Sequence, residues 1–176
     1  PSALFAVAKA FAENPNAVAV CGVGALVDRQ GVLRRHVPFR PFQPARLKTA
    51  FEYVQPATFY RRSAWEQVGG LDENLHYAMD WDLLLKLSKV GDCVAIPEVV
   101  ASYRDYEETK TSTGGWPRMA EIAMIGRRHN GIFDLNNLSF ALRSFLPRVP
   151  LYRRLVDNIF WKLNDRQPVM ISGWPT

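Results

Sequence analysis

The sequence lacks a long hydrophobic run and has only two cysteines in 176 residues. No segment reaches the roughly 20 consecutive apolar residues that a membrane-spanning helix needs. Cys21 and Cys93 have no metal-ligand spacing and form no Cys-x-x-Cys pair, and both lie in apolar runs with the character of strands. We therefore expect two buried, reduced thiols, as in a protein of the reducing cytoplasm, and no disulfide.

Several motifs of enzymes are also missing. The sequence has no Gly-x-Ser-x-Gly and no Walker motif, and Gly22-x-Gly24 lacks the third glycine of a dinucleotide-binding fingerprint. The histidines are scattered without metal spacing, so we expect surface or core residues at His36, His76 and His129. No metal ligand is assigned within the chain.

The net charge of +5 is concentrated in the last third of the chain. Residues 116–176 hold 9 Lys and Arg against 4 Asp and Glu, whereas residues 1–115 hold 13 of each kind. This asymmetry fits an anionic partner, and it fits equally well a solvated basic helix face. The aromatic and basic residues of 145–163 favour either a helix at an anionic membrane surface or an amphipathic helix packed on the domain.

Apolar periodicity and turn residues predict alternating helices and strands, and hence an α/β or α+β fold. There are too few strands for a complete nucleotide-binding sheet. Ser63 and Glu66 form a capping-box pattern for a short helix that ends at Gly69-Gly70. The other expected elements are helices over 2–13, 80–90 and 117–130, short strands over 17–21, 23–27, 93–96 and 99–103, and a hairpin partner over 32–37.

Asp80 is the sharpest candidate for chemistry. A carboxylate in the first turn of a helix faces unpaired backbone N–H groups and the positive end of the helix dipole, which keep it ionised as a general base requires. Asp82 points about 200° away around the helix and cannot share this task. The alternative for Asp80 is a simple helix-capping residue.

The order of residues 58–87 resembles the acceptor-side half of a family 2 glycosyltransferase with the GT-A fold. The resemblance is carried by Gly69-Gly70-Leu71-Asp72-Glu73, followed by Asp80-x-Asp82-Leu83 at the start of an apolar helix. Met79 stands where the family commonly has Glu. A later loop, Tyr103-Arg104 to Lys110-Thr111, is similar to one that often reads Arg-x-His-x-x-Ser-Lys. The His of that loop can bind the metal in the family, and Tyr106 stands at its position here.

The resemblance implies a partial GT-A domain with a mixed sheet over residues 1–115 and an α-helical extension over 116–176. The nucleotide-binding half, with its Asp-x-Asp metal motif, would precede Pro1. The implied activity is inverting transfer of a sugar from a nucleotide-diphosphate donor to a hydroxyl acceptor. The implied roles are general base for Asp80, acceptor binding for Gly70, Trp81 and Asp82, and binding of the donor diphosphate for Arg104, Lys110 and Thr111.

The resemblance also implies cofactors and partners. Mg²⁺ or Mn²⁺ would act in the intact enzyme, with its main ligands outside this chain. The acceptor would be a glycan, a lipid-linked molecule or another hydroxyl compound. We expect a cytoplasmic protein, with a peripheral contact at the inner face of the cell membrane through 145–163 as an open alternative. The chain alone would be inactive, and self-association as a homodimer would cover apolar faces exposed in half of a GT-A sheet.

Two alternatives differ in class. The first is a non-catalytic GT-A-like domain for binding or assembly, which Met79 and Tyr106 favour. The second is a basic nucleic-acid-binding module over 116–176, and this segment has no recognisable motif of that class.

Overall fold

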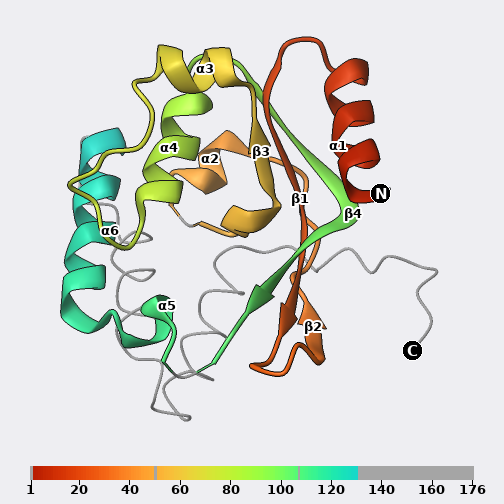
Figure 1. Ribbon diagram of the computed structural model, residues 1–176. Coiled ribbons are helices and arrows are strands. Elements are labelled where there is room, and N and C mark those ends of the chain that lie inside the picture. The colour runs from red at the N-terminus through yellow and green to blue at the C-terminus, as the bar shows by residue number, and fades with distance from the viewer. Residues whose placement is uncertain (1, 50, 107, 131–176) are drawn as a thin grey trace.

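The computed structural model describes residues 2–49, 51–106 and 108–130, and within them four strands form one mixed sheet (Figure 1). The long strand β1 (Ala17–Val27) pairs antiparallel with β2 (Leu33–His36) and β3 (Thr58–Tyr60), and parallel with β4 (Asp92–Arg104). β2 and β3 pair with different halves of β1, whereas β4 follows it along its whole length. The expected α/β class with a mixed sheet is confirmed.

β1 and β4 are each one continuous strand, where the sequence predicts two short ones. Gly22 does not break β1, because its missing side chain makes room for β4: a Cβ atom there would lie 2.3 Å from Cγ2 of Val100. Pro97 does not break β4, because the pairing with β1 is irregular around it and jumps from Ala95 to Val99. A proline without an N–H is tolerated in such a bulged stretch.

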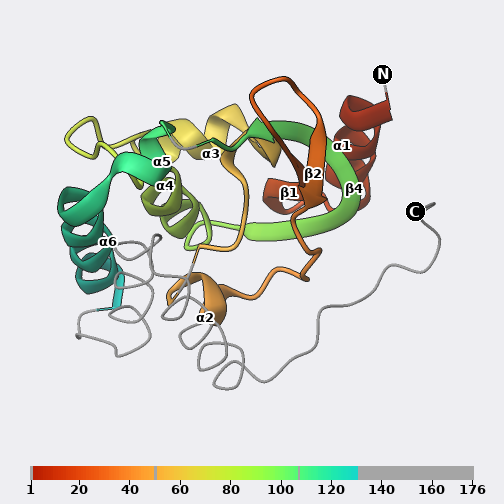
Figure 2. The same cartoon turned by 90° about the horizontal axis from the view of Figure 1, so that it is seen from below.

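Helix α1 (Ser2–Glu13) covers one face of the sheet, with the bounds that its apolar periodicity predicts (Figure 2). Its buried side chains, Val7 and Ala10, pack against Val20 of β1 and Ile96 of β4.

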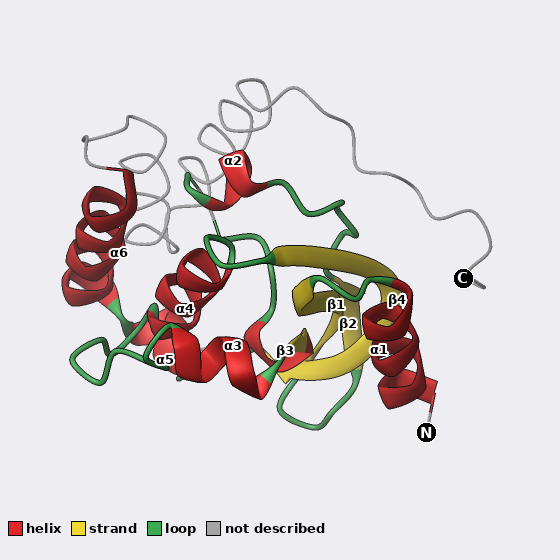
Figure 3. Cartoon of the chain, turned by 90° about the horizontal axis from the view of Figure 1, so that it is seen from above, coloured by secondary structure: helices red, strands yellow, loops and turns green. Residues whose placement is uncertain are grey.

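The remaining helices lie on the other face, where α4 (Met79–Leu87) is placed between the sheet and α6 (Gly115–Asn130) (Figure 3). Buried apolar side chains of α4 pack on Ala19 and Cys21 of β1. On the side away from the sheet, α4 packs on Ile122 and Ile125 of α6. The main core of the described residues therefore surrounds α4. The shorter helices are α2 (Pro44–Leu47), η1 (Gln55–Ala57), α3 (Arg62–Gln67) and α5 (Lys110–Thr113).

The capping box predicted for α3 is wrong. The helix begins at Arg62, so Ser63 lies inside it, and the N-cap residue Arg61 makes no side-chain capping bond. The Arg61 guanidinium instead donates to the carbonyl of Ala17 at 2.8 Å and so fixes this corner to β1. The glycine turn that follows is confirmed, since Gly69 and Gly70 have φ angles of +77° and +67°.

Both cysteines are free thiols, as expected. Burial raises the pKa of Cys21 and of Cys93 to about 12, so both stay protonated at neutral pH. Over the described part of the chain, none of the helices combines the length and the apolar character that crossing a membrane requires. The segment 145–163 lies outside the described residues, so its contact with a membrane surface stays a prediction.

Candidate functional site

A cavity of about 290 Å³ lies beside the start of α4. Its walls come from β3, α4, the segments that precede them and the first residue of α5. Aromatic and leucine side chains form most of the lining, and Asp80 and Lys110 add one acidic and one basic group. The full lining is Phe51, Gln55, Thr58, Tyr60, Leu71, His76, Tyr77, Met79, Asp80, Leu83, Leu84, Leu87 and Lys110.

Asp80 is the second residue of α4, and the N-cap residue of this helix is Ala78. The Asp80 carboxylate accepts a hydrogen bond from the backbone N–H of Trp81 at 2.8 Å. Burial raises the pKa of the Asp80 carboxyl, against the opposing effects of backbone N–H groups and of nearby Arg118. The net direction is opposite to the one expected from the helix start alone, and a higher pKa makes the carboxylate a better proton acceptor.

The residues expected to bind the diphosphate are spread over two elements. Lys110, the first residue of α5, lines the cavity, and its ammonium lies 5.8 Å from the centre of the Tyr77 ring. The side chain of Thr111 is not among those that the structure describes. Arg104 is the exposed last residue of β4 and does not line the cavity. Of this set, the structure brings Lys110 to the same cavity as Asp80.

The three residues expected to contact the acceptor do not line this cavity. Trp81 is 1% exposed, and its indole N–H donates to the carbonyl of Leu47 at 2.7 Å, so it is a core residue and offers no face to a sugar. Gly70 is buried in the turn after α3, where a Cβ atom would lie 2.6 Å from the Trp65 ring. Trp81 is held in the core around α4, and Gly70 is held close to the Trp65 ring of α3.

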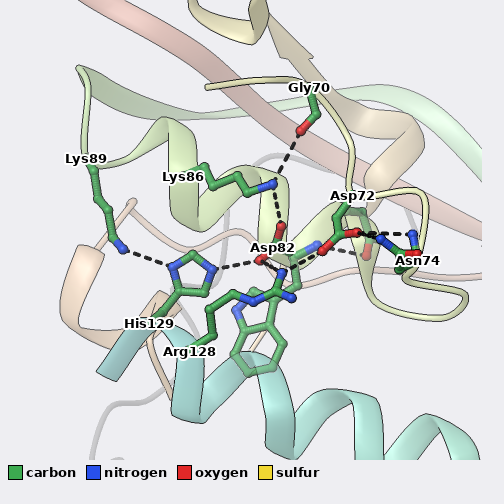
Figure 4. Close-up of polar contacts among 10 residues, drawn as sticks. Gly70, Asp72, Asn74, Asp82, Lys86, Lys89, Arg128 and His129 are labelled. Carbon is green, nitrogen blue, oxygen red and sulfur yellow. Dashed lines mark hydrogen bonds and ion pairs between the residues drawn. The ribbon is translucent and has the colours of Figure 1, made fainter. Parts of the chain in front are cut away.

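Asp82 is fully buried and belongs to a cluster of charged side chains (Figure 4). Its carboxylate meets Lys86 Nζ at 2.8 Å, Arg128 Nη1 at 3.1 Å and His129 Nε2 at 2.8 Å. Burial by itself raises the pKa of Asp82, but the bonds from His129, Lys86 and Arg128 outweigh it and hold that pKa well below the usual range. A carboxylate occupied in this way cannot receive an acceptor, which corrects the role expected for Asp82.

The charged cluster joins three segments. Arg128 of α6 also pairs with Asp72 in the turn after α3 at 2.8 Å, and His129 contacts Lys89 through its other ring nitrogen at 3.0 Å. Figure 4 shows Arg128 and His129 of α6 and Lys86 of α4 converging on Asp82. The cluster fixes α6 on α4.

Glu121 of α6 is a polar residue near the site that the sequence does not reveal. Its Oε1 accepts the backbone N–H groups of Tyr77 and Ala78, both at 2.7 Å, and its Oε2 accepts that of His76 at 2.9 Å. These partners are 43 to 45 residues away in the chain, so no local pattern signals the contact. The Glu121 carboxylate thus binds the N-cap residue of α4 and the two residues before it.

Among the described residues, no group of three or more His, Cys, Asp or Glu side chains is arranged to hold a divalent metal ion. Tyr106, which stands at the His position of the loop that resembles family 2 enzymes, lies with its ring under the guanidinium of Arg29, 4.8 Å from the ring centre. The described residues therefore do not fit a metal centre, and no chemical step through a metal follows from them.

A mixed α/β sheet with a carboxylate-bearing cavity beside it is compatible with a Rossmann-like glycosyltransferase domain. No protein-family model matches the chain. The chain is similar to the uncharacterized glycosyltransferase YwdF of Bacillus subtilis (strain 168), with 24% identity over 119 residues. The match covers 66% of this chain and 42% of that relative, so the chain spans less than half of the relative's length. This similarity supports a relationship to glycosyltransferases.

Proposed function

We propose that this chain is the acceptor-side part of an inverting family 2 glycosyltransferase with the GT-A fold. The observation that carries the proposal is the placement of Asp80. It stands in the first turn of α4, lines the cavity, and has a pKa raised by burial. The similarity to a glycosyltransferase supports the same class of reaction.

In the proposed reaction the Asp80 carboxylate accepts the proton of an acceptor hydroxyl. The acceptor oxygen attacks the anomeric carbon of the donor sugar from the side opposite the diphosphate. The bond between that carbon and the diphosphate oxygen breaks, its electron pair leaves with the diphosphate, and the configuration inverts. The proton stays on Asp80. Lys110, in the same cavity, offsets negative charge that develops on the leaving group.

The rest of the proposal concerns the substrates, further contacts of the donor, the metal, the location and self-association. The donor is a nucleotide sugar, and the acceptor is a glycan, a lipid-linked molecule or another hydroxyl compound. Arg104 and Thr111 remain proposed contacts of the diphosphate. Mg²⁺ or Mn²⁺ is retained only as an ion whose ligands lie elsewhere in the whole enzyme. Cytoplasmic location, a peripheral membrane contact through 145–163 and a homodimer are proposals of the same standing.

The test is the substitution Asp80→Asn in the longest natural polypeptide that contains this chain. The amide keeps the size and the acceptor oxygen of the side chain but cannot take a proton. We expect transfer to fall about 10²–10⁴-fold, the usual effect of losing a general base. Donor affinity and thermal unfolding should stay near those of the wild type. The control is Asp92→Asn, an exposed carboxylate at the start of β4. Turnover within a few-fold of the wild type for Asp80→Asn would refute the role of Asp80.

A second candidate is a non-catalytic domain that keeps the fold for binding or assembly. The stacking of Arg29 on Tyr106 favours it, because this position then serves packing in place of metal binding. Unchanged partner binding in Asp80→Asn, together with no detectable transfer in the wild type, is the result that this candidate predicts.

A further inference from the structure

We propose that Glu121 of α6 is a positioning residue for Asp80, because it holds the backbone turn from which α4 and its cavity-lining carboxylate begin. This inference rests on the proposed function for its catalytic meaning. Its structural content concerns the described residues alone. α6 would then hold Asp80 in position, although α6 contributes no side chain to the cavity lining.

The contacts of Glu121 replace a missing cap. A helix leaves its first N–H groups without partners inside the helix, and a Glu at the third helical position often reaches back to the N-cap N–H. In α4 the N-cap is Ala78, which makes no side-chain cap, and the third helical position is Trp81, which is buried in the core. Neither residue can cap the helix. Glu121 supplies the carboxylate from another helix: it accepts the N–H of the N-cap residue Ala78 and also those of Tyr77 and His76, which lie just before the helix.

The three N–H groups lie directly before the catalytic candidate. They belong to residues 76–78, and Asp80 follows two residues after the last of them. His76 and Tyr77 also line the cavity. Glu121 therefore fixes the cavity wall and the start of α4 together, and a shift of this turn would move the Asp80 carboxylate relative to an acceptor.

Glu121 stands on a helix that is packed firmly against α4. Met119, Ile122 and Ile125 of the same helix are buried in the core around α4. Further along α6, Arg128 and His129 bind Asp82 of α4. Packing and ion pairs thus tie α6 to α4 on both sides of Glu121, so its carboxylate has a defined place from which to hold the turn.

α6 also brings two opposite charges to Asp80. Arg118 lowers the pKa of the Asp80 carboxyl and Glu121 raises it. Arg118 is placed one helical turn before Glu121 and interacts in addition with Tyr103 of β4. The other titratable groups of the cavity wall are His76, Tyr77, Tyr60 and Lys110. Arg118 and Glu121 have opposite effects on the pKa of Asp80. A purely structural role of Glu121 would not change that pKa, so its measurement distinguishes the two.

The experiment is a pH titration of the Asp80 side-chain carboxyl carbon by NMR in this chain, for the wild type, Glu121→Gln and Arg118→Gln. Glu121→Gln keeps an oxygen for the N–H groups of Tyr77 and Ala78, loses the bond to His76 and removes the charge, so the Asp80 midpoint should move to lower pH. Arg118→Gln should move it to higher pH. The matched control is Glu98→Gln, an exposed carboxylate on β4, which should leave the midpoint in place. An unchanged or higher midpoint in folded Glu121→Gln, together with unchanged amide resonances of residues 76–78 in Glu121→Ala, would overturn the proposal.

Two further readouts cover the positioning itself. The amide proton resonances of Tyr77 and Ala78 should shift upfield in Glu121→Ala and much less in Glu121→Gln. In the complete enzyme, Glu121→Ala should lower kcat up to about 10²-fold, with the acceptor KM nearly unchanged, because a small misplacement of a catalytic group is costly. Amide resonances that do not respond in Glu121→Ala would contradict the proposal. The NMR results do not depend on Asp80 being the base, so they separate this inference from the test by Asp80→Asn.

Discussion

Asp80 and Asp82 are two residues apart in one helix and have opposite surroundings. Asp80 borders a largely apolar cavity, and burial raises its pKa. Asp82 is fully buried, yet bonds from His129, Lys86 and Arg128 hold its pKa well below the usual range. A carboxylate that readily takes up a proton suits a base, whereas one held ionised by three partners suits a structural ion pair. The helical rotation between neighbouring positions is what separates the two roles.

Gly70 shows how one residue type can be required twice at a single position. Its φ is +67°, and a Cβ atom would lie 2.6 Å from the Trp65 ring. Gly69 has a φ of +77°, but a Cβ atom added there would have no neighbour within 4 Å. Gly69→Ala should therefore lose only the roughly 1–2 kcal/mol of a left-handed backbone. Gly70→Ala should lose more, because Trp65 must also move.

Urea unfolding of both glycine variants measures the difference. The Gly69→Ala variant is the control for backbone strain, so the excess loss in Gly70→Ala reports the contact with Trp65. Equal destabilisation of the two variants would show that Trp65 yields without cost.

At the scale of elements, the join between α4 and α6 depends on the charged cluster around Asp82. Removing one partner of a buried ion pair costs about 3–5 kcal/mol. For Asp82→Asn we expect the lower end of that range or less, because the Lys86 and Arg128 side chains are 26% and 39% exposed and stay partly hydrated.

The pH dependence of this loss has a definite sign. The folded-state pKa of Asp82 is lowered, so its contribution to stability is present above the unfolded-state pKa of about 3.9 and is lost as the pH falls below it. The gap in unfolding free energy between wild type and Asp82→Asn should be full at neutral pH and shrink in acid. Asp92→Asn, at an exposed site, should change stability by less than about 0.5 kcal/mol. An Asp82→Asn variant as stable as the wild type at neutral pH would contradict the prediction.

Local signals in the sequence predict the elements well where the signal is complete. The apolar period of 2–13, the hairpin after Asp28 and the double glycine after α3 all give the structure that forms. The capping box at Ser63 fails, because the distant carbonyl of Ala17 captures Arg61 and the helix starts one residue early.

The site was predictable only in part, because its remaining features depend on contacts between distant segments. The position of Asp80 at a helix start follows from its sequence context. The hydrogen bond from Trp81 to Leu47 joins residues 34 positions apart. The bond from the Ala78 N–H to Glu121 joins residues more than 40 positions apart. Such contacts have no period and no local motif. The acceptor role expected for Asp82 fails for the same reason, since its partners on α6 lie 46 and 47 residues away.

At the scale of the whole molecule, the described residues provide an incomplete set of groups for a nucleotide-sugar donor. Lys110 lines the cavity, but Arg104 does not, and no group of side chains in the described part of the chain is arranged to hold a metal. The chain matches 42% of its glycosyltransferase relative. Within the proposed function, the residues that bind the nucleobase, the ribose and the metal of the donor lie in the part of the enzyme that this match does not cover.

We therefore expect this 176-residue chain by itself to bind nucleotide sugars poorly. An exposed cation that meets a diphosphate without its metal contributes about 0–1 kcal/mol, which is too little for micromolar affinity. Calorimetry with UDP-, GDP- and dTDP-sugars in the presence of Mn²⁺ measures this directly, and an NMR spectrum of the same sample shows whether the chain is folded. Lys110→Ala is the matched variant, and it should give the same weak heats as the wild type. Micromolar binding by the folded wild-type chain, reduced in Lys110→Ala, would mean that the donor site is complete within these residues, and the division of the enzyme proposed above would be wrong.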